Sequence, residues 1–246
     1  MTKACGIHFI ISRRVATAAT LSNGVHRLVT LSRSIELLSS GLVITLASHA
    51  VPHWVHHRLF GAAPAWRSAL TDQIGRANVH DLLALLFALI LVMGAPVRSG
   101  LRIGRVGRHW KSVLFIVALQ WALTAAVYPN LPTRPFAGAR IGMWLISPAA
   151  QELVFLGFLY GLFAQHWPRR LHPRSPINGA LLLTAGFFSA WHLTNLLTIS
   201  PTFVAFQLCY VFVLTLLSGL TRIWTGSVLY AIVVHMGVNY IAWAAG

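Results

Sequence analysis

Apolar stretches, each close to the length of a membrane-spanning helix, follow one another along the 246-residue chain. A helix needs about 20 mainly apolar residues to cross the hydrocarbon core of a bilayer. The stretches lack the strict alternation that a membrane β-barrel requires. The pattern predicts an all-α fold, a polytopic membrane helical bundle of about seven transmembrane helices, at Ile35–Val51, Val79–Val97, Ser112–Tyr128, Ile141–Phe163, Ile177–Ile199, Thr202–Leu220 and Ile223–Trp243.

Composition supports a membrane protein and excludes the common soluble classes. Hydrophobic residues make up 57% of the chain and charged residues 9%, whereas charged residues are about 25% of a soluble domain. The high apolar content also excludes intrinsic disorder. Two cysteines, Cys5 and Cys209, lie in unrelated contexts and form neither a disulfide framework nor a CxxC metal site.

The charge balance is strongly basic, with 19 Lys and Arg against 4 Asp and Glu. In a soluble protein this balance would suggest nucleic-acid binding. Here most basic residues lie between apolar stretches, where they act as topology signals and contact anionic lipids. The distribution favours a multi-pass protein of the cell (inner) membrane with a cytoplasmic N-terminus, in contact with the bilayer and not with nucleic acid.

The same pattern divides the chain into three parts. Residues 1–34 are predicted to be a basic N-terminal leader, residues 35–97 two N-terminal transmembrane helices, and residues 98–246 a membrane core. A histidine cluster ends the first span, at His49, His53, His56 and His57. His53 and His57 have the spacing of a metal-ligand pair, but His is also common at membrane interfaces, and we predict no metal site there.

Glu152 is the one acidic residue in the middle of a predicted span. A carboxylate there costs several kcal/mol unless it is paired, hydrated or neutralised, so it indicates a functional site. The alternative is a protonated Glu that joins two helices by a hydrogen bond. Polar residues on two other spans favour function: His192 and Asn195 share one helix face, as do His235 and Asn239.

Three ordered motifs identify a resemblance. They are QELVFLGFLYG at 151–161, FSAWH at 188–192 and HMGVN at 235–239. Together with the lead-in RIWTGSVLYAIVVH and the basic segment RSGLRIGRVGRHWK, they resemble the CAAX protease and bacteriocin-processing family of intramembrane endopeptidases, which includes type II CAAX prenyl endopeptidases. The family's motifs are EExxxR followed by GFL, then FxxxH, then HxxxN. The resemblance covers roughly residues 98–243.

The first motif departs from the family at two positions. Its first Glu is Gln151 here and its Arg is Leu156. Gln cannot accept a proton at neutral pH, so that role cannot pass to residue 151. One acid and one base are lost together, and an unpaired buried charge is costly. We therefore hypothesise that Gln151 and Leu156 replaced a charge pair and left Glu152 as the working carboxylate.

The resemblance implies a glutamic-type, metal-independent hydrolase that needs no cofactor and acts on a membrane-anchored peptide or protein. Glu152 and His192 would activate a water molecule, and His235 and Asn239 would donate hydrogen bonds to the oxyanion. The residues Gln151, Phe188 and Asn195 would position the substrate or the site.

Three other interpretations stay open at this point. One Glu with two His can ligate zinc, although no HExxH motif is present. The altered first motif could mark a pseudoprotease that binds hydrophobic peptides without cleaving them. A proton-coupled transporter also uses buried Glu and His, but no internal repeat supports it.

Overall fold

The computed structural model describes residues 5–60, 76–94, 99–104, 106–127, 142–197 and 199–245. The chain divides into two compact units, Met1–Leu42 and Val43–Gly246. In the first unit the described residues belong to helix α1 (Cys5–Phe60), which continues into the second unit. All the predicted site residues lie in the second unit.

The predicted fold class is confirmed. Apart from one isolated bridge, every regular element of the described residues is helical. The further elements are α3 (Arg76–Gly94), η1 (Gly107–His109), α4 (Trp110–Val127), η3 (Gly142–Ile146), α5 (Ser147–Glu152), η4 (Leu153–Leu159), α6 (Tyr160–Ala164), α7 (Gly179–Trp191), η5 (His192–Leu197), α8 (Pro201–Thr225) and α9 (Leu229–Ala245).

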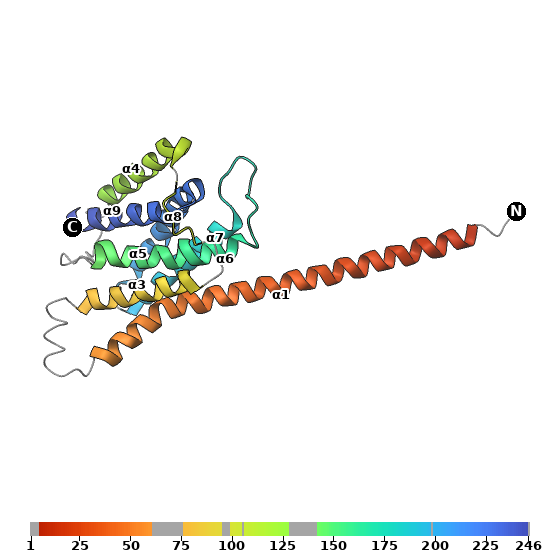
Figure 1. Cartoon of the computed structure of the whole chain (residues 1–246), viewed down its shortest axis with the longest axis horizontal. Coiled ribbons are helices and arrows are strands. Elements are labelled where there is room, and N and C mark those ends of the chain that lie inside the picture. The colour runs from red at the N-terminus through yellow and green to blue at the C-terminus, as the bar shows by residue number, and fades with distance from the viewer. Residues whose placement is uncertain are drawn as a thin grey trace. The chain divides into compact units, whose positions relative to one another are not determined.

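Each predicted span has a helical counterpart. Within the described residues, five helical stretches are long and apolar enough to cross a membrane, and Val79–Gly94 and Leu229–Ala242 are shorter apolar helices. In the second unit, α3 packs on α5, α7 on α8, and α9 on both α4 and α8 (Figure 1). This packing brings α5, α7 and α9, which carry the three motifs, into one bundle.

Two helix starts follow directly from local sequence. Asn178 caps α7, since its side-chain oxygen accepts from the Leu181 amide at 2.9 Å. Ser200 caps α8 and Pro201 occupies the first turn, where its missing N–H costs nothing. These caps fix where both helices begin, and α7 in turn places His192 at its carboxyl end.

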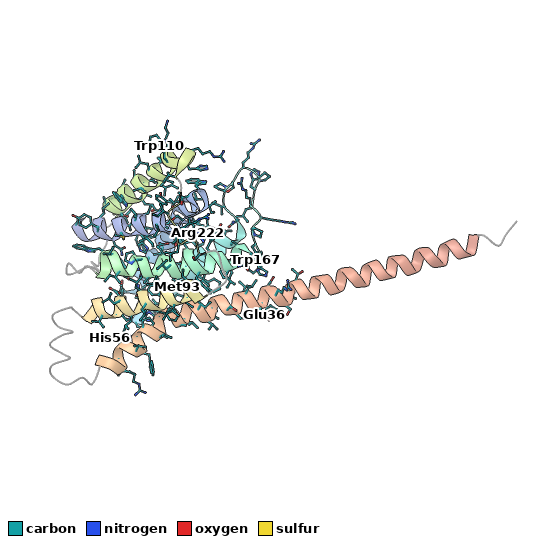
Figure 2. The ribbon with its side chains drawn as sticks, in the orientation of Figure 1. Glu36, His56, Met93, Trp110, Trp167 and Arg222 are labelled. Atoms are coloured by element: carbon teal, nitrogen blue, oxygen red, sulfur yellow. The ribbon has the colours of Figure 1, made fainter. Side chains whose placement is uncertain are left out.

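The predicted boundary between the last two spans is wrong. We expected a break at Thr221 and Arg222, but α8 continues to Thr225 and ends at Gly226, whose φ of 69° is left-handed. Arg222 stays inside the bundle, 5% exposed, with its guanidinium 5.0 Å from the centre of the Tyr160 ring (Figure 2). An aromatic face stabilises a partly desolvated cation, so a basic residue does not end this helix.

The segment 99–104 fastens onto the turn between α8 and α9. The Val228 amide donates to the Gly100 carbonyl at 3.0 Å, and the Ser227 hydroxyl donates to the Arg102 carbonyl at 2.5 Å. Farther along, the Tyr230 hydroxyl donates to the Gly104 carbonyl at 3.0 Å. The amino end of α9 is therefore held by hydrogen bonds to a segment that precedes it by more than a hundred residues.

The helix that carries the first motif is not a uniform α-helix. Its turns have π-helical geometry at η3 and again at η4, on either side of the α-helical α5. Glu152 is the last residue of α5 and every residue of η4 is buried. Such widened turns are frequent at functional sites because they rotate side chains relative to a regular helix.

Candidate active site

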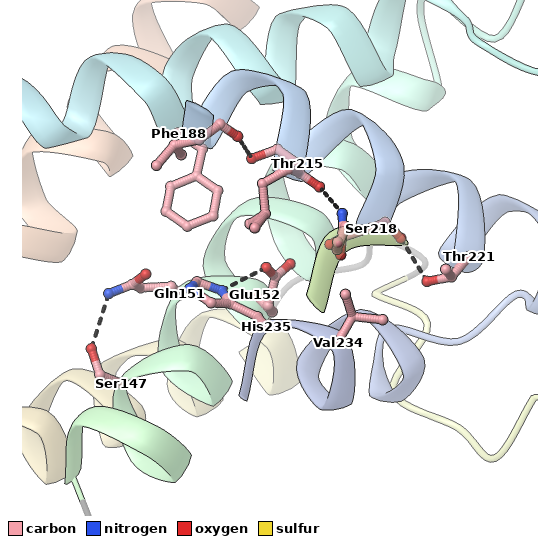
Figure 3. A network of polar contacts seen from close by, with 12 residues as sticks. Ser147, Gln151, Glu152, Phe188, Thr215, Ser218, Thr221, Val234 and His235 are labelled. Carbon is pink, nitrogen blue, oxygen red and sulfur yellow. Dashed lines mark hydrogen bonds and ion pairs between the residues drawn. The ribbon is translucent and has the colours of Figure 1, made fainter. Parts of the chain in front are cut away.

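Glu152 and His235 form a buried pair between α5 and α9. Oε1 of Glu152 lies 2.9 Å from Nδ1 of His235 (Figure 3). Glu152 is 0% exposed and His235 7% exposed. The other carboxylate oxygen, Oε2, has no hydrogen-bond partner among the described residues. The acid of the first motif thus contacts the histidine of the third motif.

His192 lies at the end of α7 with a fixed ring orientation. Its Nδ1 lies 3.0 Å from the carbonyl oxygen of Phe188. Since a carbonyl oxygen can only accept, Nδ1 carries the proton in this contact. Neutral His192 therefore keeps a lone pair on Nε2, the ring nitrogen left for a water molecule or a substrate.

Aromatic packing holds the two histidine rings in place. Phe188 is fully buried and stacks on Phe155, with ring centres 4.4 Å apart. The centre of the Phe188 ring also lies 5.3 Å from that of His192 and 5.9 Å from that of His235. Phe188, expected to be a positioning residue, lies against both imidazoles.

A cavity of about 280 Å³ lies among α5, η5, α8 and α9. The predicted site residues that line it are Gln151, His192, Asn195, His235 and Asn239. Glu152 and Phe188 do not line the cavity. Glu152 contacts His235 and Phe188 contacts His192, and both histidines line it. The structure thus brings the three motifs together, with the imidazole of His235 between the Glu152 carboxylate and the cavity.

The neighbours Gln151 and Glu152 leave α5 in different directions (Figure 3). Gln151 donates from Nε2 to the Ser147 hydroxyl at 2.9 Å and does not share the contact with His235. Asn195 donates from Nδ2 to Oε1 of Gln207 at 2.8 Å. Leu156 is fully buried. Of the two positions that depart from the family motif, residue 151 is therefore an amide that lines the cavity, and residue 156 is an apolar side chain in the core.

Sequence reasoning missed four polar or aromatic residues that line the cavity: Ser147, Trp191, Gln207 and Tyr210. Ser147 lies one helical turn before Gln151, so spacing could have indicated it. Trp191 directly precedes His192, and adjacent residues do not share a helix face, so spacing gives no signal for it. Gln207 and Tyr210 lie on α8, which carries no motif. Only the packing of α8 on α7 brings them to the site.

No group of three or more His, Cys, Asp or Glu side chains is arranged to hold a metal in the part of the chain that the structure describes. At the end of α1, His49 and His53 stack with ring centres 6.3 Å apart. His53 and His56 lie beside His80 of α3, with ring centres 6.3 Å and 6.4 Å away.

Comparison with known proteins gives one family match. Residues 133–241 match the model of the type II CAAX prenyl endopeptidase Rce1-like family. The resemblance inferred from the three motifs is thereby confirmed, because the matched segment contains all of them. No curated protein and no solved structure is detectably similar to the chain. At the level of the family, the match supports a CAAX-type intramembrane protease, a multi-pass membrane hydrolase.

Proposed function

We propose that this protein, whose residues 133–241 are Rce1-like, is an endopeptidase that hydrolyses a membrane-anchored peptide in the cavity between α5, η5, α8 and α9. The observation that carries the proposal is the buried contact between Glu152 and His235 beside that cavity. A bundle that buries a carboxylate at 0% exposure against an imidazole does so at a cost in solvation. A catalytic role of the pair would explain why the protein tolerates this cost.

His192 is the proposed base that activates the water molecule. The lone pair on Nε2 of His192 accepts a proton from a water molecule in the cavity, while the Phe188 carbonyl holds the ring through Nδ1. The water oxygen bonds to the scissile carbonyl carbon. General-base catalysis of this kind contributes about 10²–10⁴ in rate. When the C–N bond breaks, His192 returns the proton to the leaving amine.

Glu152 is assigned to work together with His235. In this proposal His235 contacts Oε1 of Glu152 through Nδ1, 2.9 Å away, and presents an Nε2–H donor to the cavity, with the carboxylate balancing its charge. That donor and the amide of Asn239, which also lines the cavity, stabilise the negative oxygen of the intermediate. The predicted roles of His192, His235 and Asn239 are kept. Glu152 does not line the cavity, so in this proposal it acts on the reaction only through the negative charge that it places beside His235.

The substrate's anchor has a place next to the cavity. A second cavity of about 280 Å³ between α4 and α8 shares Tyr210 and Leu214 with the first and is otherwise mainly apolar. An apolar chain attached to the peptide would lie there while the peptide bond reaches the imidazoles. The family description names prenyl endopeptidases, so a farnesylated peptide is the first substrate to test.

The test uses the purified protein in liposomes with two peptides, one farnesylated at a C-terminal cysteine and one anchored by a transmembrane helix. Cleavage in H₂¹⁸O is scored by mass spectrometry. We expect a new C-terminus that carries one ¹⁸O, absent with His192→Ala and retained with His166→Ala, which changes an exposed histidine outside the cavity. Absence of cleavage of both peptides by wild-type protein contradicts the proposal.

Two rival interpretations are decided by the same preparation. Gln151 in place of an acid favours a pseudoprotease, which would bind the farnesylated peptide without cleaving it. A zinc protease would lose activity with 1,10-phenanthroline. We expect the chelator to leave the rate unchanged, because the described residues offer no arranged set of three ligands. Stoichiometric zinc with chelator-sensitive cleavage would contradict this expectation.

A further inference from the structure

A smaller cavity of about 30 Å³ lies beside the candidate active site, among α1, α3, α5 and the end of α7. Side chains with polar atoms supply much of its wall: Ser48, His80, Asp81, Ser147, Gln151 and Trp191. The last three of these also line the larger cavity. The two cavities therefore share one wall, which consists of a hydroxyl, an amide and an indole.

The groups around the small cavity are suited to a water molecule. Asp81 is buried, 9% exposed. Nε1 of Trp191 is also buried, and no acceptor for it exists among the residues that the structure describes. A buried donor without an acceptor costs about 1–3 kcal/mol. The volume exceeds the roughly 10–15 Å³ that one water needs. A water in this cavity that donates to Asp81 and accepts from Trp191 would give the indole N–H its partner.

On its other side the small cavity approaches the histidine cluster. His80 lines the cavity, and its Nδ1 lies 3.7 Å from Oδ1 of Asp81. His80 is half-buried, and its ring adjoins those of His53, which is exposed, and His56. Polar side chains thus extend from an exposed position on α1 to the shared wall.

We propose that Asp81 and Trp191 hold a water molecule in this cavity and that it supplies the hydrolytic water of the candidate active site, past Gln151. The inference rests on the proposed function, since only hydrolysis consumes water there. Each turnover needs one water, whose oxygen ends in the new carboxyl group. Asp81 and Trp191 are positioning residues in this scheme, because they contact the water before it reaches His192.

The water is tested without any substrate by hydroxyl-radical footprinting with mass spectrometry. Radicals formed at bound water oxidise neighbouring side chains, so Trp191 should be oxidised several-fold faster than Trp121. Because Trp191 also lines the larger cavity, the excess is assigned to the small cavity by Asp81→Leu, which should reduce it; an excess that Asp81→Leu leaves unchanged also overturns the proposal. Trp121 is the matched control, since it is also half-buried but its Nε1 donates to the Val234 carbonyl at 3.2 Å. Oxidation of Trp191 at the rate of Trp121 or slower overturns the proposal.

The supply of water is tested kinetically with Asp81→Asn and Trp191→Phe. We expect kcat to fall about tenfold for Asp81→Asn, less than for a group that transfers the proton itself, with unchanged KM and melting temperature. Asp81→Glu should recover part of kcat, and Glu36→Gln, at an exposed acid in the other unit, should keep it all. An unchanged kcat, or a loss that follows the melting temperature, overturns the proposal.

The two tests separate this inference from the proposed function. If wild-type protein cleaves neither peptide, the proposed function fails, and rapid oxidation of Trp191 then identifies a water site that serves no hydrolysis. If cleavage occurs and Trp191 is protected, the peptidase stands and the water-supply site is wrong.

Discussion

The substitution Glu152→Gln tests the assignment of the buried carboxylate. Gln has the same shape, and its side-chain oxygen can still accept from Nδ1 of His235, 2.9 Å from Oε1 in the wild-type protein. The substitution removes the negative charge and keeps the hydrogen bond. It therefore separates the electrostatic role of Glu152 from its role in holding α5 against α9.

The expected magnitudes follow from that contact. A hydrogen bond to a charged group is worth about 1.5–3 kcal/mol and a neutral one about 0.5–1.5 kcal/mol, so the protein should lose about 1 kcal/mol of stability. In the proposed mechanism the negative charge of Glu152 supports His235 as an oxyanion donor, so removing that charge costs one donor. Loss of one such donor lowers kcat about 10²–10³-fold. We expect that loss in Glu152→Gln with KM nearly unchanged.

The assay is the rate of ¹⁸O-labelled product formation in liposomes, with the melting temperature of each purified variant measured in detergent. Glu152→Leu is the companion variant: it leaves Nδ1 of His235 without its acceptor, so it should lose more stability than Glu152→Gln. Glu36→Gln makes the same charge change at an exposed position and should match wild type. If Glu152→Gln keeps more than a tenth of the wild-type kcat, the carboxylate has no electrostatic role in the reaction.

Three further sets of variants test the oxyanion donors, the charge-pair hypothesis and the helix packing. Asn239→Ala should lower kcat about 10²–10³-fold with a small change in melting temperature, since it removes the second oxyanion donor; equal effects on KM and kcat would contradict this. Gln151→Glu with Leu156→Arg should melt higher than Leu156→Arg alone, which buries an unpaired cation; a double variant no more stable or active than both single ones refutes the charge-pair hypothesis. Gly237→Ala should lose about 1–3 kcal/mol, because a Cβ there would overlap the indole of Trp121 on α4. Gly186→Ala, where a Cβ meets nothing within 4 Å, should not destabilise. Equal melting temperatures would contradict the packing of α9 on α4.

Hydropathy predicts the number and order of the helices well, because burial in lipid and burial in protein select the same apolar residues. It fails at Arg222, where the apolar run is interrupted but the helix is not. The cation is placed over the Tyr160 ring, which is distant in sequence. A sequence window contains no information about that contact, so the boundary between the last two helices is predicted several residues too early.

Motif spacing brings the residues of one helix onto a common face but does not determine how helices rotate against each other. For this reason the sequence indicates that Glu152, His192 and His235 belong together, while the choice of His235 as the partner of Glu152 depends on the packing of α5 on α9. Asp81 illustrates the same limit. In the sequence it lies near a helix end, where a carboxylate is ordinary and indicates no site. Only the packing of α3 on α5 brings it to the same small cavity as Gln151.

The attachment of segment 99–104 to the base of α9 has a consequence for the catalytic geometry. His235 lies seven residues after Val228, about 10 Å along the helix axis at 1.5 Å per residue. Because its first turn is tethered, α9 has little freedom to rotate about its own axis. The direction in which His235 and Asn239 point is therefore set at the start of the helix, about two turns before His235. The alignment of the proposed oxyanion donors thus depends on segment 99–104, which does not line the cavity.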